Sequence, residues 1–439
     1  MSTYWNSQVS SKVPSLASTP PTTPGSGSEF GDALHPTLDP RSLPLLDECH
    51  DRFILVIGGL GFIGSHTSLE LLKAGYNVII VDDLSNSFHS VFTRIQTLAD
   101  KHYQGSEKKR PVLHFHKLDY RSMSMRFLLE SYSNMIPAPS EHPDHPPSLT
   151  RQSRIAGVIH FAAFKSVSDS IVSPIPYYQN NVCGLVDLVE LLGKHSIYNF
   201  VFSSSATVYG TKANAGKPLR EEDLVHHSEA FIDENGHQQV AEPMIAGLQS
   251  PYARSKYFCE AILADIAKSN SAWRIVALRY FNPIGCDPSG LLGEDPKGTP
   301  TNLFPVITQV LTGVRKELDV FGTDWDTRDG TAIRDFIHVS DVARGHIAAL
   351  SAKHEASFRT FNLGSGTGTT VTEAVKSLAA AASREIPLKS AGRRAGDVGF
   401  CVASNERAAT ELGWKAIESI PQCARDLWNF VTRQGQTSQ

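Results

Sequence analysis

The sequence predicts an α/β fold, a Rossmann-type doubly wound parallel sheet with a smaller C-terminal substrate-binding lobe, and three observations support this prediction. A continuously apolar run, Phe53 to Ile57, is typical of a buried parallel strand. Glycines spaced by three follow it, and a segment of helical character then ends at Gly75. A second strand, from Asn77 to Val81, ends in Asp82. This order of elements predicts a dinucleotide-binding unit.

The glycine turn has the spacing that a pyrophosphate requires. Gly58, Gly61 and Gly64 allow a tight turn, a close approach of the backbone to phosphate oxygens and close packing of helix on strand. The phosphate would then lie at the helix N-terminus, where free N–H groups favour negative charge. Asp82 lies 21 residues after Gly61, where a carboxylate binds ribose hydroxyls. Because no arginine neighbours Asp82, the sequence favours NAD over NADP.

A second segment places a phenol and an ammonium one helical turn apart. Pro251 is suited to begin a helix, which puts Tyr252 and Lys256 at positions i and i+4 on one face. A free phenol has a pKa of about 10 and is a poor base at neutral pH. A nearby ammonium and an oxidised nicotinamide both stabilise phenolate, so we expect them to lower that pKa. Tyr252 would then accept a proton from a substrate hydroxyl.

A third segment brings hydroxyl groups to the end of a strand. The apolar residues from Phe200 to Phe202 lead into Ser203, Ser204 and Ser205. Ligands of open α/β sheets bind outside the carboxyl ends of the strands. A serine hydroxyl at this position would share a hydrogen bond with a substrate oxygen and the phenol.

From about Phe53 to Trp428 the sequence resembles the UDP-glucose 4-epimerases of the extended short-chain dehydrogenase/reductase family. The motifs that carry the resemblance occur in the family's order. They are GGLGFIGSHT (Gly58–Thr67), VDDLSNS (Val81–Ser87), HFAAFKSV (His160–Val167), YYQNN (Tyr177–Asn181), FSSSATVYG (Phe202–Gly210), SPYARSK (Ser250–Lys256), LRYFNPIG (Leu278–Gly285), GEDPKGTPTNL (Gly293–Leu303), RDFIHVSD (Arg334–Asp341), NLGSG (Asn362–Gly366) and RRAGD (Arg393–Asp397).

The resemblance implies a role for each residue that matches a family motif. The catalytic residues would be Ser205, Tyr252 and Lys256. The residues that bind NAD would be Gly58, Gly61, Phe62, Ile63, Gly64, Asp82, Asn86, Ser87, Asp119, Tyr120, Phe161, Ala162, Lys165, Asn180, Tyr280 and Phe281. The residues that bind the sugar nucleotide would be Asn282, Asn302, Leu303, Val320, Phe321, Arg334, Arg394, Asp397 and Cys401.

The chemistry that the resemblance implies is a temporary oxidation of a UDP-hexose at C4. Tyr252 would take the proton of the 4-hydroxyl while NAD takes the hydride. The 4-keto sugar, held by its nucleotide, would turn over, and the hydride would return to the opposite face. Because the net redox change is zero, we expect NAD to stay tightly bound. Binding energy would be concentrated on the UDP, so that the sugar is free to rotate.

Cys401 departs from part of the family. It lies four residues after Asp397, where relatives carry either a bulky Tyr or a small residue. A small residue there goes with room for an N-acetyl group, which gives the hypothesis that UDP-GlcNAc and UDP-GalNAc are also converted. The alternative is that Cys401 is merely a small core residue.

Three other functions share parts of this pattern. A sugar-nucleotide 4,6-dehydratase needs an acid and a base for water loss, and Ser205-Ala206-Thr207 offers no carboxylate. A 4-epimerase of UDP-glucuronate or of a UDP-pentose would share the nucleotide contacts and stays open. A non-catalytic NAD-sensing regulator also stays open, although the intact Ser205, Tyr252 and Lys256 disfavour it.

Composition narrows the class of protein. The net charge of -4 gives no indication of nucleic acid or an anionic membrane surface as a partner. The six cysteines are scattered, no apolar run reaches transmembrane length and no signal peptide opens the chain, so the sequence predicts a cytoplasmic protein. We expect no metal site at His114 and His116 or at His142 and His145, because further ligands are missing nearby. The resemblance implies a homodimer.

The sequence also predicts how the chain is divided. Residues 1–50, rich in Ser, Thr, Pro and Gly, would be a disordered arm. Residues 51–281 would form the NAD-binding Rossmann domain, with a strand and helix near 334–350 crossing back to it, and residues 282–439 the substrate-binding lobe. Two insertions interrupt this plan, a similarly polar and Pro-rich stretch within 134–155 and a surface loop within 225–248.

Overall fold

The computed structural model describes residues 51–137, 149–233, 235–245, 247–298, 300, 302–352, 356–394 and 396–437. These residues belong to one compact unit. The predicted disordered arm, residues 1–50, lies outside the described residues, as do His142 and His145.

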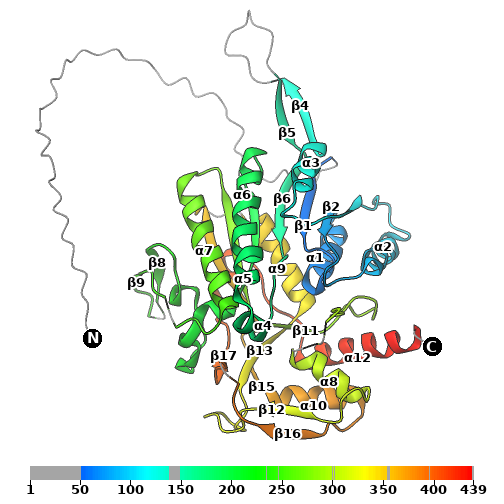
Figure 1. The fold of residues 1–439 in the computed structure, drawn as a ribbon, viewed down its shortest axis with the longest axis vertical. Coiled ribbons are helices and arrows are strands. Elements are labelled where there is room, and N and C mark those ends of the chain that lie inside the picture. Colours follow the sequence, from blue (N-terminus) through cyan, green and yellow to red (C-terminus); the bar gives the residue numbers. More distant parts are fainter. Residues whose placement is uncertain are drawn as a thin grey trace, which may run out of the picture. The chain divides into compact units, whose positions relative to one another are not determined.

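Seven parallel strands form the central sheet, in the order β14-β10-β7-β6-β1-β2-β3 (Figure 1). Strand order reverses between β1 and β6, which is the switch point where ligands of such sheets bind. The three strands predicted from apolar runs, β1, β2 and β7, are confirmed. The bounds are β1 (Phe53–Ile57), β2 (Asn77–Asp82), β3 (Leu113–Lys117), β6 (Ile155–His160), β7 (Asn199–Ser205), β10 (Arg274–Tyr280) and β14 (Phe358–Leu363).

Helices cover both faces of this sheet. Because side chains alternate along a strand, each strand supplies two apolar cores. Helices α1, α2 and α9 pack on one core and α3, α6 and α7 on the other, so the doubly wound Rossmann-type prediction is confirmed. Their bounds are α1 (Phe62–Lys73), α2 (His89–Tyr103), α3 (Ser124–Ser131), α6 (Gly184–Lys194), α7 (Pro251–Ser269) and α9 (Val339–Ser351). The short helices are α4 (Val167–Val172), α5 (Pro174–Tyr177), the π-helix η2 (Tyr178–Cys183) and the 3₁₀ segments η3 (Ala206–Ala215) and η4 (Glu221–Asp223).

A second group of elements follows β10 and has its own core, to which α8, α10 and α12 contribute. Strands β11, β13, β15 and β17 form one small sheet, and β12 pairs with β16. The bounds are β11 (Asn282–Ile284), α8 (Leu303–Leu311), β12 (Leu318–Phe321), β13 (Ile333–His338), β15 (Gly368–Thr370), α10 (Val371–Ala382), β16 (Leu388–Ala391), β17 (Phe400–Cys401), α11 (Glu406–Glu411) and α12 (Ile420–Thr437).

The return of the chain to the large sheet differs from the prediction. Helix α9 does return and packs against α1. The strand near Arg334, β13, instead lies in the small sheet, where it pairs with β11, β15 and β17. The strand that returns is β14, which pairs in parallel with β10. An apolar run predicts a strand but not the sheet that it joins, which is why the assignment of β13 was wrong. The domain division at 281/282 itself stays a prediction.

Both insertions form antiparallel hairpins. Strand β4 (Ser133–Pro137) pairs with β5 (Leu149–Ser153), and β8 (Glu229–Ile232) pairs with β9 (Gln238–Ala241). The second insertion, predicted as a surface loop, is a hairpin whose described residues are mostly exposed. Its turn is held by the Asp233 carboxylate, which accepts hydrogen bonds from the backbone N–H groups of Asn235 and His237, both at 2.9 Å.

His160, the last residue of β6, makes the second core sensitive to acid. Its ring stacks against Phe200 and Phe202, and its Nδ1 atom is buried without a hydrogen-bond partner. Burial lowers the pKa of His160 to about 3. In the unfolded chain His160 is protonated below about pH 6.5, whereas in the folded protein it stays neutral down to about pH 3. Protonation therefore favours the unfolded state, and this residue destabilises the fold progressively as the pH falls below about 6.5.

We expect His160→Phe to remove this penalty. At pH 8 the imidazole is neutral in both the folded and the unfolded protein, so its protonation does not affect the comparison. The free energy of unfolding of the variant minus that of wild type should be larger at pH 4.5 than at pH 8 by about 2–3 kcal/mol. Urea unfolding at the two pH values measures this, and an unchanged difference between them contradicts the prediction.

Candidate active site

The glycine turn after β1 forms a cradle with no room for side chains. Gly58 has a φ of +77°, and a Cβ atom there would lie 2.7 Å from the backbone nitrogen of Ala162. A Cβ atom on Gly64 would lie 2.2 Å from the Gly58 carbonyl oxygen. Gly61 caps α1, and no side chain caps that helix or adds a carboxylate to its first turn. The helix N-terminus thus fits a dinucleotide pyrophosphate.

Asp82 joins this turn to the end of β2. One of its carboxylate oxygens accepts the backbone N–H of Leu60 at 3.0 Å, and the other accepts the hydroxyl of Ser87 at 2.7 Å. Asn86 accepts the backbone N–H of Lys297 at 3.2 Å, so a segment between β11 and α8 reaches the predicted ribose site. The structure therefore brings the predicted adenosine-side residues of β1 and β2 together.

Neighbouring strand ends supply the next predicted cofactor residues. Phe161 and Ala162 follow β6 and donate backbone hydrogen bonds to the carbonyl of Ile57 at 2.8 and 3.2 Å. Tyr120 donates to the carbonyl of Asn180, at 2.5 Å, which links the loop after β3 to η2. Asp119 instead pairs with Arg121 at 2.7 Å, and hydrogen bonds from that guanidinium hold the pKa of Asp119 below its usual range.

The predicted catalytic residues meet at the ends of β7 and β10. Pro251 is the first residue of α7, Ser250 caps it, and both Tyr252 and Lys256 are buried. The Lys256 ammonium donates to the carbonyl of Ser203 at 2.5 Å. Tyr252 and Ser205 share a side-chain hydrogen bond. Tyr280, a predicted NAD-binding residue, pairs with Ser205 in the register of the two strands.

Burial dominates the protonation of this pair. It raises the pKa of Tyr252 to about 12, although the hydrogen bond with Ser205 acts in the opposite direction. It also lowers the pKa of Lys256 to about 8, against the influence of Cys259 and Glu260. The expectation that the ammonium lowers the phenol pKa is therefore not met by the protein's own groups. Desolvation of the phenolate is the larger effect.

The predicted sugar-nucleotide residues lie in the small sheets and at α8. Arg334 of β13 pairs with Asp397 at 3.0 Å and lies opposite Cys401 of β17 in the parallel register. Arg394 stacks on the ring of Phe321 with its guanidinium carbon 3.7 Å from the ring centroid. The others lie in or beside β11, β12 and α8, namely Asn282, Asn302, Leu303 and Val320.

Four charged or polar residues escaped the sequence prediction. One oxygen of Glu294 accepts from Lys165 at 2.9 Å and from Asn302 at 3.1 Å, which joins a predicted cofactor residue to a predicted substrate residue. A buried ion pair of Glu260 and Arg279, at 2.7 Å, lies behind the serines of β7. His346 contacts Tyr280. The GEDP motif was the one signal for Glu294, while long-range pairs leave no local pattern.

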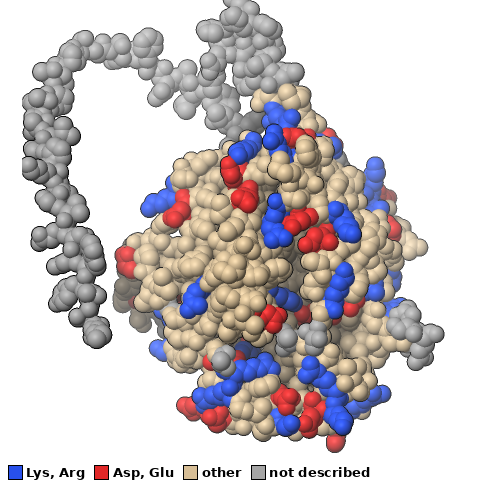
Figure 2. All heavy atoms as spheres, viewed as in Figure 1, with Lys and Arg blue, Asp and Glu red and all other residues tan. Residues whose placement is uncertain are grey.

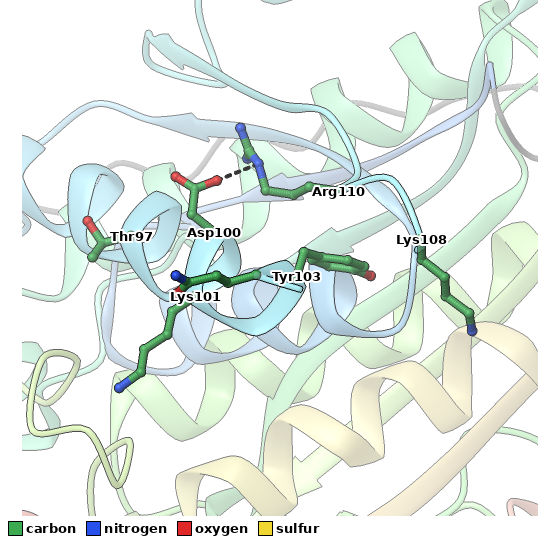
Figure 3. A pocket seen from close by; sticks show the side chains of 7 residues that line it. Thr97, Asp100, Lys101, Tyr103, Lys108 and Arg110 are labelled. Atoms are coloured by element: carbon green, nitrogen blue, oxygen red, sulfur yellow. Dashed lines mark ion pairs between the residues drawn. The ribbon is translucent and has the colours of Figure 1, made fainter. Parts of the chain in front are cut away.

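A surface hollow of about 620 Å³ lies away from these residues (Figure 3). Its lining comes from the second half of α2 and the loop that follows, and the Arg110 guanidinium there pairs with Asp100 at 2.7 Å. No predicted site residue lines it. The lining residues are Thr97, Asp100, Lys101, Tyr103, Gln104, Lys108 and Arg110.

Within the described part of the chain, no three His, Cys, Asp or Glu side chains gather as metal ligands would. His114 and His116 both contact the hydroxyl of Tyr132, at 2.6 and 3.0 Å. None of the described helices combines the length and the apolar character needed to cross a membrane.

Comparisons with known proteins agree with this geometry. Residues 54–364 match the family described as the NAD dependent epimerase/dehydratase family. UDP-glucose 4-epimerase 2 of Arabidopsis thaliana is 41% identical over 383 residues, covering 87% of this chain and 95% of the relative. The human UDP-glucose 4-epimerase is 38% identical, covering 86% of this chain and 95% of the relative.

Solved structures give the same result. The UDP-glucose 4-epimerase of Bifidobacterium longum in complex with NAD+ and UDP has a TM-score of 0.71 and 37% identity, with 87% of this chain and 99% of that chain covered. The enzyme of Stenotrophomonas maltophila with bound NAD and formylated UDP-arabinopyranose has a TM-score of 0.72 and 34% identity, with 88% and 99% covered. The chain belongs to the NAD dependent epimerase/dehydratase family and, within it, to the UDP-glucose 4-epimerases.

Proposed function

We propose that this protein interconverts UDP-glucose and UDP-galactose by 4-epimerisation, with NAD as a bound cofactor. The observation that carries the proposal is the meeting of Ser205, Tyr252 and Lys256 at the strand ends beside the glycine cradle. We assign residues 51–281, together with α9 and β14, to cofactor binding and the remainder of 282–439 to the UDP-sugar.

Each catalytic residue has a task that its surroundings support. Tyr252 takes the proton of the sugar 4-hydroxyl and returns it, and Ser205 shares the hydrogen bond that orients the phenol. Lys256, fixed by the Ser203 carbonyl, keeps a positive charge behind them. Bound NAD⁺ supplies the hydride acceptor and a positive charge that stabilises the phenolate of Tyr252. Burial of the phenol excludes water from the proton transfer.

Cofactor retention is what the cradle would provide. Gly58, Gly61 and Gly64 hold the pyrophosphate, and Asp82 holds the adenosine ribose. Because NAD is regenerated in each turnover, the catalytic cycle does not require it to dissociate. The test is to incubate purified protein with each UDP-hexose, without added coenzyme, and to identify the products. Failure to convert UDP-galactose and UDP-glucose under these conditions would overturn the proposal.

A wider substrate range rests on the residue opposite Arg334. Cys401 is partly buried on β17, directly beside a residue of the predicted substrate site. Its thiol is much smaller than a Tyr side chain, which leaves space at the sugar. We infer that UDP-GlcNAc and UDP-GalNAc are substrates as well.

We expect Cys401→Tyr to abolish most activity on the acetylated sugars, by about 100-fold, since a bulky side chain then clashes with the N-acetyl group. Activity on UDP-galactose should stay within about twofold of wild type. Rates on both substrates, measured side by side, check the prediction. Equal retention of both activities would show that Cys401 is a small core residue without influence on substrate choice.

A homodimer is the assembly that we propose. Helices α4, α5 and α7 pack against one another, α6 and α7 both pack against η2, and these helices expose large apolar side chains on a face with few charges (Figure 2). Exposed apolar side chains on neighbouring helices mark a contact surface, and a second copy of the chain would bury them. These side chains are Ile171, Val172, Ile175, Val186 and Phe258.

The dimer is tested by Ile175→Lys. A lysine buried in this interface would lose its hydration without gaining a partner charge, so we expect the variant to be monomeric at concentrations where wild type is dimeric. Light scattering after size-exclusion chromatography gives the mass. A monomeric wild type would refute this assembly.

The scattered cysteines fit a reducing compartment, and we place the protein in the cytoplasm.

A further inference from the structure

His346 of α9 is fully buried and contacts two of the predicted NAD-binding residues. Its Nε2 atom lies 2.5 Å from the hydroxyl of Tyr280, and its ring centroid lies 4.7 Å from that of Phe161. Tyr280 is the last residue of β10, and Phe161 directly follows β6. One imidazole thus contacts aromatic side chains from the ends of two strands of the large sheet.

The surroundings fix which nitrogen of His346 carries the hydrogen. The Nδ1 atom lies 2.8 Å from the carbonyl oxygen of Val342, one turn earlier on the helix. A carbonyl only accepts, so Nδ1 donates and Nε2 is left with its lone pair. The Tyr280 hydroxyl therefore donates to Nε2. Burial lowers the pKa of His346 to about 4, which keeps this acceptor available at neutral pH.

Tyr280 in turn reaches the catalytic residues. A hydrogen bond from the Ser203 side chain and the proximity of Tyr252 both influence the pKa of Tyr280, which burial raises well above its ordinary value. The carbonyl of the same Ser203 accepts the Lys256 ammonium. The hydroxyl of Tyr280 thus has one partner on the catalytic side and one partner, His346, on the helix behind it.

The position of α9 explains how His346 arrives there. Gly345 precedes it, and a Cβ atom at that position would lie 2.7 Å from a methyl carbon of Leu363 on β14. The glycine lets the helix lie close against the large sheet. Because α9 also packs against α1, the helix after the glycine cradle, His346 is held from both sides.

We propose that His346 is a positioning residue that fixes Tyr280 and Phe161 for the nicotinamide half of NAD. This inference rests on the proposed function. Without the imidazole, the O–H group of Tyr280 would be buried without an acceptor, which favours a rotated side chain. Phe161 would lose its ring neighbour at the same time. The pocket would then bind the cofactor less tightly and place it less well for reaction.

Four variants test the contact: His346→Leu, His346→Gln, Tyr280→Phe and the double variant His346→Leu/Tyr280→Phe. The first readout is the NAD released per mole of protein after denaturation, without any substrate. After dialysis we expect His346→Leu to retain about threefold less NAD than wild type, or less still. Its kcat should fall about tenfold, and its KM for UDP-galactose should stay within about twofold of wild type. His346→Gln keeps an acceptor, and most of the NAD should stay bound.

The double variant decides whether the two residues act through each other. If the hydroxyl and the imidazole form one unit, Tyr280→Phe changes NAD retention in wild type but changes it little in the His346→Leu background. Independent, multiplicative losses in the two backgrounds overturn the proposal. Full NAD retention and full kcat in His346→Leu overturn it as well.

His338→Leu is the matched control for a purely structural effect. His338 caps the same helix, is equally buried and bonds Asp426 of α12 at 3.3 Å rather than a predicted cofactor residue. It should lower the melting temperature and leave NAD retention unchanged. If His338→Leu loses as much NAD as His346→Leu, general loosening explains both and the proposal fails. Wild type that holds NAD but converts no UDP-hexose would refute the proposed function alone.

Discussion

Tyr252→Phe is expected to lower kcat for UDP-galactose by about 10³-fold at pH 7–8, because no other group replaces the proton acceptor. The phenol is buried at the ends of β7 and β10 and shares its hydrogen bond with Ser205. Phenylalanine has the same shape, so the pocket should keep its form. NAD content and the affinity for UDP should therefore match wild type, which separates lost chemistry from lost binding.

Tyr257→Phe is the matched control for this variant. Tyr257 lies on the same helix, one residue after Lys256, and its ring contacts His226 with 5.0 Å between ring centroids. Its loss should change kcat by less than about twofold. A Tyr252→Phe protein that retains more than about a tenth of wild-type kcat would show that another group moves the proton.

The second large effect concerns the ion pair behind the serines. Glu260→Gln is expected to lower the free energy of unfolding by about 3–5 kcal/mol, because it leaves the Arg279 guanidinium buried without its carboxylate. Both side chains are 0% exposed, and their closest atoms lie 2.7 Å apart. Burial alone would raise the pKa of Glu260, but the charge of Arg279 and a hydrogen bond from His226 outweigh it and hold that pKa far below its usual range.

Gln has the size of Glu, so no cavity contributes to the loss. The control is Glu190→Gln on α6, where the Lys194 pair at 2.5 Å is 64–65% exposed and its loss should cost less than about 1 kcal/mol. Urea unfolding of the three proteins at pH 7 makes the comparison. Equal losses in the two variants would contradict this prediction, because they would mean that the backbone carbonyl partners of Arg279 stabilise its charge without the carboxylate.

The sequence predicted the parts of the site that depend on local pattern. Short apolar runs end at Ile57, Val81 and Phe202 because buried strands need apolar side chains, and each run lies in a strand of the large sheet. Glycines at spacing three predicted the cradle, and Pro251 predicted the start of α7. Each of these signals is complete within about a dozen residues.

The parts that the sequence did not predict depend on partners far along the chain. Tyr280 and His346 are 66 residues apart, and Glu260 meets Arg279 through the fold rather than through a motif. The prediction also overestimated how far the Lys256 ammonium lowers the pKa of Tyr252, because the spacing of two residues does not reveal how deeply they are buried. Burial turned out to decide that pKa.

The β8–β9 hairpin was not predicted from the sequence either. Residues 229–241 are polar at alternate positions without a strong apolar face, so neither strand is visible by itself. What holds the hairpin in place is Glu229, whose carboxylate meets Arg407 at 2.7 Å and also pairs with Arg359. Those arginines belong to α11 and β14, well over a hundred residues away.

The late arrival of β14 has a consequence for synthesis. The ribosome makes 77 residues between the end of β10 and the start of β14. At about 5–20 residues per second, that takes roughly 4–15 seconds. Until β14 emerges, the outer edge of β10 presents unpaired backbone groups to any neighbouring polypeptide. The edge of the large sheet is therefore exposed to aggregation until its last strand, β14, is translated, and a shield over that edge during those seconds would raise the yield of folded enzyme.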